Sequence, residues 1–113
     1  MLTVGGDHSI ASGTIHGLLD KYSDLKVIWV DAHGDIIDAG KSEYQGYHGM
    51  PLSHLIGVND NKIPGFDWFT RRLNPRNVVH IGMRDIDNDE WDTLSKFKIK
   101  CFTPDHIDML GIG

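Results

Sequence analysis

The stretch from Leu25 to Asp35, LKVIWVDAHGD, joins an apolar run to a cluster of ionisable residues. Residues 25–30 are β-branched, aromatic and too apolar for a strand with one face in water, so we expect a strand buried on both faces of a parallel sheet. Ligands of such sheets bind beyond the carboxyl ends of the strands. The stretch therefore predicts a central strand with a binding site at its end.

Strands and helices alternate along the rest of the chain. Further strands are expected at 2–4, 77–81 and 99–102. Helices are expected from Ser9, from Pro51 to Ile56, over 87–97 and from Pro104 to Met109. Long connections are expected at 36–47 and 59–70. This order predicts an α/β domain over residues 1–113 with an open sheet of parallel strands.

Composition narrows the class of protein. A chain of 113 residues suits one small domain. Its net charge of -5 disfavours nucleic acid as a partner, because a phosphate backbone selects a basic face. The single cysteine, Cys101, cannot close an internal disulfide, and there is no apolar run of signal-peptide or membrane-spanning length. We expect a cytoplasmic protein without a membrane partner.

Three ionisable residues alternate along the end of the central strand. Asp31, His33 and Asp35 share one face of an extended segment, with successive members roughly 7 Å apart. Such groups in apolar surroundings repel or lose solvation unless a cation is present. Carboxylates with imidazole suit a divalent metal, and bridging carboxylates allow two ions. The alternative is that these residues only cap a helix and make loop hydrogen bonds.

A second turn brings another histidine to the same edge of the sheet. The sequence Gly5-Gly6-Asp7-His8-Ser9 stands between a predicted strand and a predicted helix. Neighbouring parallel strands place their carboxyl-end loops around one crevice, so His8 can join the cluster. Taken alone, it would be interpreted as a turn histidine beside flexible glycines.

Six short motifs in order along the chain resemble the ureohydrolase family, which contains arginases, agmatinases and formimidoylglutamases. Two are the turns around His8 and His33 already described. The other four, at 47–52, 63–68, 82–87 and 108–113, resemble arginases in particular. The resemblance implies a three-layer α/β/α fold with a mostly parallel sheet, like that of arginases and deacetylases and incomplete in this chain.

The resemblance also implies a role for each ionisable residue. His8 would ligate one manganese ion and His33 the other, Asp31 would bridge them, and Asp35 would bind metal and hold the attacking hydroxide. The implied reaction is hydrolysis of the guanidinium group of L-arginine to L-ornithine and urea with two Mn²⁺ ions. Homo-trimers are common in the family, so we expect a homo-oligomer.

Three further residues match the family outside the metal cluster. His48 matches a proton-shuttling histidine, for which a pKa near neutrality is suitable. Asp87 and Glu90 match acids that receive the α-amino group of the substrate. The alternatives are an exposed loop imidazole for His48 and ordinary acids at a helix N-terminus for the other two.

The sequence departs from the family pattern in two respects. The third motif, with two further metal-binding aspartates, is absent, so we expect a fragment. Ile37 and Tyr44 replace an asparagine and a serine that would bind the substrate carboxylate. The alternatives are a ureohydrolase acting on another guanidino compound, such as agmatine, or a non-catalytic truncated chain. Uncovered sheet surface should make the isolated chain self-associate.

Overall fold

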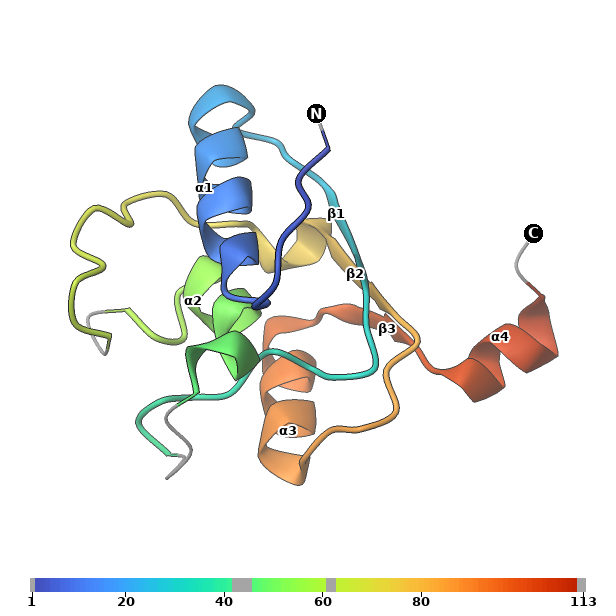
Figure 1. Ribbon diagram of the computed structural model, residues 1–113. Helices are drawn as coiled ribbons and strands as arrows, with labels where there is room; N and C mark the ends of the chain where they lie inside the picture. The colour runs from blue at the N-terminus through green and yellow to red at the C-terminus, as the bar shows by residue number, and fades with distance from the viewer. Residues whose placement is uncertain (1, 42–45, 61–62, 112–113) are drawn as a thin grey trace.

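The structure is a computed structural model that describes residues 2–41, 46–60 and 63–111. Within these residues, three strands and four α-helices alternate in sequence, with two short 3-10 helices between them (Figure 1). In chain order the elements are α1 (Ile10–Lys21), β1 (Val27–Val30), η1 (Tyr47–Gly49), α2 (Pro51–Leu55), η2 (Pro75–Asn77), β2 (Val78–Ile81), α3 (Asn88–Phe97), β3 (Lys100–Phe102) and α4 (Pro104–Leu110).

The strands form one parallel sheet in the order β1-β2-β3. Trp29 of β1 is in register with His80 of β2, and His80 with Cys101 of β3, so these three side chains share a face. The loops after β1 and β2 stay joined beyond the sheet by a bridge between His33 and Asp85. The predicted α/β class with a parallel sheet is confirmed.

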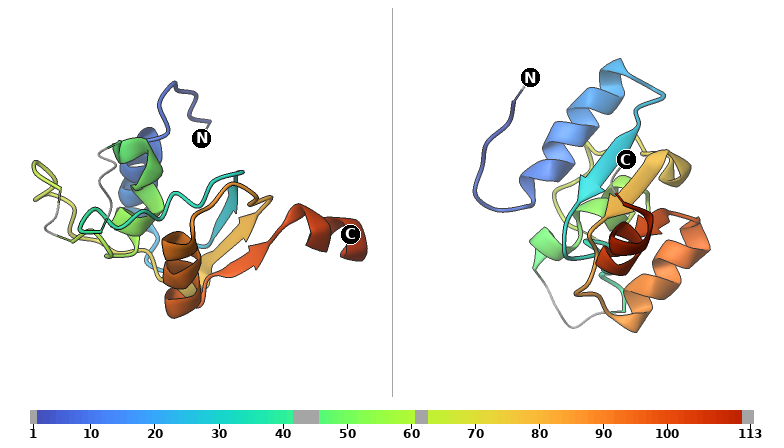
Figure 2. Two further views of the ribbon diagram at one scale, coloured as in Figure 1. Left: turned by 90° about the horizontal axis from the view of Figure 1, so that it is seen from below. Right: turned by 90° about the vertical axis from the view of Figure 1, so that its right-hand side faces the viewer.

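The core lies between the sheet and helices α1, α2 and α3, which all lie on one side of it (Figure 2). Its largest buried apolar side chains include Leu52 and Leu55 of α2, Val78 of β2 and Leu94 of α3. Full burial of such a side chain contributes roughly 1.5–3 kcal/mol. Helix α4 lies apart from this helical layer, beyond the end of β3 (Figures 1 and 2).

Local sequence accounts for where the helices begin. Proline at the first position of α2 and of α4 has no amide hydrogen to leave unpaired. Ahead of α3, the amide of Asp87 donates to Glu90 Oε2 at 3.2 Å, which is half of a capping box. These three predicted starts are confirmed.

Two predictions about strands are wrong within the described residues. Residues 2–4 are not a strand, and Leu2 is 87% exposed, because no described strand lies beside them to supply hydrogen bonds. The central strand is buried on one face only: Ile28 and Val30 on the other face are 70% and 74% exposed. Helices α1, α2 and α3 cover the opposite face, so this face of β1 is uncovered within the described residues.

The two predicted connections lack α-helix and strand in their described parts, apart from the η1 turn that begins at Tyr47. No helix within the described residues combines the length and the apolar character needed to cross a membrane.

Candidate metal centre and active site

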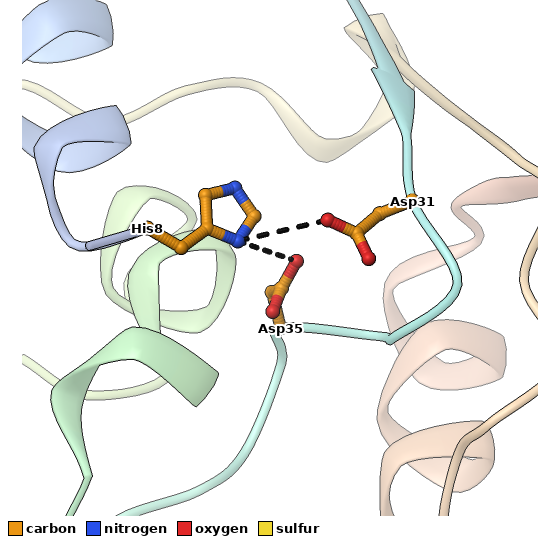
Figure 3. Close-up of side chains that lie close together, drawn as sticks. All are labelled: His8, Asp31 and Asp35. Atoms are coloured by element: carbon orange, nitrogen blue, oxygen red, sulfur yellow. Dashed lines mark ion pairs between the residues drawn. The ribbon is translucent and has the colours of Figure 1, made fainter. Parts of the chain in front are cut away.

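His8, Asp31 and Asp35 converge at the carboxyl end of β1 (Figure 3). Nδ1 of His8 lies 3.6 Å from Asp31 Oδ2 and 3.3 Å from Asp35 Oδ2. One potential ligand atom from each residue falls within 4.8 Å of the other two. The turn before α1 and the end of β1 therefore meet as predicted.

Asp31 stands between two histidines. Its Oδ2 faces His8, whereas its Oδ1 lies 3.3 Å from Nδ1 of His33 and accepts the His33 amide at 2.9 Å. The other ring nitrogen of His33 is 3.3 Å from Asp85 Oδ2. Each carboxylate oxygen of Asp31 thus faces a different imidazole.

Asp35 is held by its backbone and by its side chain. Its φ of 52° lies in the left-handed region, which non-glycine residues seldom adopt and which is often found at functional sites. Its carbonyl accepts the amides of Leu52 and Ser53 in the first turn of α2. The indole of Trp29 donates to Asp35 Oδ2 at 2.9 Å. The carboxylate is thus fixed before any ligand binds.

The electrostatics of the buried Asp35 favour a cation. Burial raises the pKa of Asp35, whereas the hydrogen bond from Trp29 and the charge of His8 act in the opposite direction. Asp35 is only 5% exposed and lies beside a second carboxylate, Asp31. A divalent ion would offset both burial and repulsion, so these donors fit a hard or borderline metal such as manganese.

His80 lies on the sheet beneath this cluster. It is fully buried, and neither ring nitrogen has a hydrogen-bond partner among the described residues. Burial lowers the pKa of His80, so its imidazole is neutral near pH 7.

A cavity of about 740 Å³ opens beside the cluster, and most of the predicted site residues line it. His8, His33 and Asp35 line it, together with His48 from η1. His48 is exposed, and its Nδ1 lies 3.9 Å from Asp7 Oδ2. The volume falls in the range typical of pockets for small molecules.

Asp87 and Glu90 line the same cavity but differ in their surroundings. Asp87 is exposed. Glu90 is buried, and its Oε1 accepts the amide of Ile36 at 3.3 Å while its Oε2 accepts that of Asp87. Burial raises the pKa of Glu90, and these two amides oppose the shift. Glu90 thus ties α3 to the loop after β1, and a contact with substrate stays a prediction for both acids.

The two departures from the family pattern have different outcomes. Ile37 lines the cavity and offers it no side-chain hydrogen-bond donor. Tyr44 lies outside the described residues. Four contributors that the sequence did not single out are Trp29, Lys41, His80 and Asp85. For Trp29 and His80 the signal was a polar ring nitrogen in an apolar strand, and for Asp85 it was the strand-end position of its loop.

Comparison with known proteins shows which family this chain resembles in sequence and in fold. The family model described as "Arginase family" matches residues 1–113. The chain belongs to the arginase family. It is 44% identical to an arginase of Glaciozyma antarctica over 99% of this chain and 33% of that protein, and 43% identical to human Arginase-1 over 99% of this chain and 36% of that one.

Solved arginase structures show the same fold. The crystal structure of a cold-adapted arginase from Glaciozyma antarctica matches with a TM-score of 0.87 at 45% identity, over 96% of this chain and 39% of that one. The arginase from Bacillus caldovelox matches with a TM-score of 0.81 at 40% identity, over 95% and 36% of the two chains. The chain spans about a third of the length of the curated arginases that it matches.

Proposed function

We propose that the protein containing this chain hydrolyses the guanidinium group of L-arginine to L-ornithine and urea, with two Mn²⁺ ions. The observation that carries this proposal is the convergence of His8, Asp31 and Asp35 beside a cavity, in a chain 43–44% identical to arginases. The roles of the individual residues are part of the proposal.

The donor set supports the choice of metal. His8, Asp31 and Asp35 would hold one ion, and the second oxygen of Asp31 with His33 would hold the other. Bound manganese would supply Lewis acidity and make a water molecule nucleophilic at neutral pH. Burial of Asp35 and its hydrogen bond to Trp29 would keep the ligands in place while the substrate enters.

The remaining residues would bind substrate and move protons. His48 lines the cavity on an exposed 3-10 turn, so it can exchange a proton with solvent and deliver it to the departing nitrogen of ornithine. Asp87, exposed at the start of α3, would attract the α-amino group, directly or through water. The guanidinium group would then be directed toward the carboxylates at the end of β1.

Ile37 supports a second candidate, hydrolysis of another guanidino compound such as agmatine. An apolar side chain in the cavity cannot satisfy a substrate carboxylate, and agmatine has none. Cytoplasmic location remains a prediction from the cysteine content and the lack of a long apolar run in the sequence, and a homo-trimer remains one from the resemblance; one relative at 46% identity is named "Arginase-2, mitochondrial", from rat.

A substrate panel separates the candidates. The protein containing this chain would be loaded with manganese and assayed for urea release from arginine, agmatine and 4-guanidinobutyrate. Arginine as the substrate with the highest kcat/KM would support the proposal. Turnover of agmatine or guanidinobutyrate without turnover of arginine would contradict it and favour the second candidate.

A further inference from the structure

The cavity beside the metal cluster has a strongly uneven charge. Six carboxylates line it, at Asp35, Asp38, Asp85, Asp87, Asp89 and Glu90. Among the described residues that line it, Lys41 is the only side chain with a permanent positive charge. A ligand with an ammonium and a carboxylate would find many partners for the first group and few for the second.

The backbone of Lys41 is anchored from beneath. The Lys41 amide donates to the carbonyl of Asp38 at 3.0 Å, and the amide of Ala39 donates to Oδ1 of Asn59 at 2.9 Å. Asn59 is fully buried and also donates to the carbonyl of Ile37 at 2.9 Å and to Oγ of Ser53 at 2.7 Å. A buried amide therefore holds the 37–41 segment at the rim of the cavity.

The side chain of Lys41, in contrast, is not held by another described side chain. It is exposed and forms no ion pair with any residue in 2–41, 46–60 or 63–111. Two exposed basic residues elsewhere, Lys26 and Arg71, do pair with carboxylates. A long cationic side chain on a fixed turn can reach an anionic group of a ligand at moderate entropic cost.

We propose that Lys41 binds the carboxylate of an amino-acid substrate and so provides the anion recognition that Ile37 cannot. This inference rests on the proposed function, since it assigns a specificity residue to that same site. Lys41 supplies a charge-assisted hydrogen bond, whereas the acids around Asp87 receive the ammonium group. Lys41 thereby favours arginine over analogues that lack the carboxylate.

The test compares ligands with and without a carboxylate on the manganese-loaded protein containing this chain. The quantities measured are KM for arginine and the inhibition constants of L-ornithine and putrescine, which is ornithine without its carboxylate. The variants are Lys41→Met and the charge-retaining Lys41→Arg. The control is Lys96→Met, an exposed lysine of α3 that does not line the cavity.

Lys41→Met is expected to raise KM for arginine and the inhibition constant of ornithine by about tenfold, the usual effect of losing one charge-assisted hydrogen bond. The inhibition constant of putrescine should rise by less than about twofold. Lys41→Arg should recover most of the loss, and Lys96→Met should match wild type. Equal weakening of ornithine and putrescine in Lys41→Met, or no change in either, would overturn the inference while arginine hydrolysis stands. Absence of urea release from the wild-type protein would instead contradict the proposed function, and this inference with it.

Discussion

The indole nitrogen of Trp29 lies 2.9 Å from Oδ2 of Asp35, the same oxygen that faces Nδ1 of His8 at 3.3 Å. Trp29 belongs to β1 and is buried in the core, whereas Asp35 lies on the loop that follows. A core side chain is thus hydrogen-bonded directly to a carboxylate of the candidate metal site. This bond orients the carboxylate and lowers its pKa against the effect of burial.

Replacing Trp29 by Phe removes this donor and keeps an aromatic ring in the core. The pKa of Asp35 should rise further, and its carboxylate should lose its fixed orientation. We expect manganese affinity near pH 7 to fall by about tenfold, at the lower end of the range for partners of metal ligands. Calorimetric titration of manganese into the two proteins measures this change.

The matched control is Trp68→Phe. The Trp68 indole donates to the carbonyl of Gly65 at 3.1 Å, away from the cluster, so its loss should leave manganese affinity unchanged. If Trp29→Phe binds manganese as tightly as this control, Trp29 has no part in holding Asp35 for the metal.

A second prediction concerns the stability of the chain at acidic pH. Burial lowers the pKa of His54 below its usual 6.5, and the charges of Arg72 and His16 lower it further against the opposing Asp60. The unfolded chain therefore binds more protons than the folded chain between that value and the folded pKa. The contribution of His54 to the unfolding free energy should be fully present above pH 6.5 and should decrease as the pH drops through this interval.

His54→Phe removes this contribution. The stacked contact with Phe69, 4.3 Å between ring centroids, is one that phenylalanine can make, and the Tyr47 hydroxyl still reaches Ser12 Oγ at 2.7 Å. Urea unfolding at a series of pH values should show wild type losing more stability than His54→Phe below pH 6.5. Parallel curves for the two proteins would refute the assignment.

The uncovered face of the sheet leads to a third prediction. Ile28 and Val30 project from β1 on the face opposite helices α1, α2 and α3, and both are exposed. Burying about 100 Å² of apolar surface between copies contributes roughly 2.5 kcal/mol, so this face should cause the isolated chain to self-associate. Ile28→Lys should shift sedimentation velocity profiles toward the monomer, and Ser23→Lys, at an exposed position, serves as the control. A wild-type chain that sediments as a monodisperse monomer would contradict this prediction.

Much of the fold followed from local sequence. The apolar run before Asp31, the prolines that open α2 and α4, and the acids that open α3 each depend on short-range physics, and each element forms close to the predicted bounds. Which faces of the strands are buried could not be predicted from local sequence. Whether Ile28 meets a helix depends on packing between distant segments. A strand rich in apolar residues has the same sequence pattern whether one face or both faces are covered.

In the candidate site, too, local sequence predicted some features, whereas others depend on contacts between distant segments. The positions of Asp31 and Asp35 just after an apolar strand marked them as candidate ligands, and the turn before α1 brings His8 to them, although residues 2–4 do not form the expected strand. The partners that fix these ligands come from elsewhere: α2 amides on the Asp35 carbonyl, and Asp85 against His33. Such contacts join residues far apart in the sequence, and no periodicity marks them. Lys41 was overlooked because its significance depends on what else lines the cavity.

The most direct test of the central claim is to measure manganese stoichiometry and urea release from arginine on the protein containing this chain, with Asp31→Asn beside it. Asparagine keeps the shape of Asp31 but removes the charge that faces both His8 and His33. Asp24→Asn, at an exposed carboxylate paired with Lys26, is the control.

We predict two bound ions and arginine hydrolysis in the wild type and in Asp24→Asn. Asp31→Asn should lose at least one ion and reduce urea production by more than the roughly 10- to 100-fold typical of residues behind the metal ligands. A wild-type protein that binds no manganese, or an Asp31→Asn variant that keeps both ions and full activity, would contradict the account.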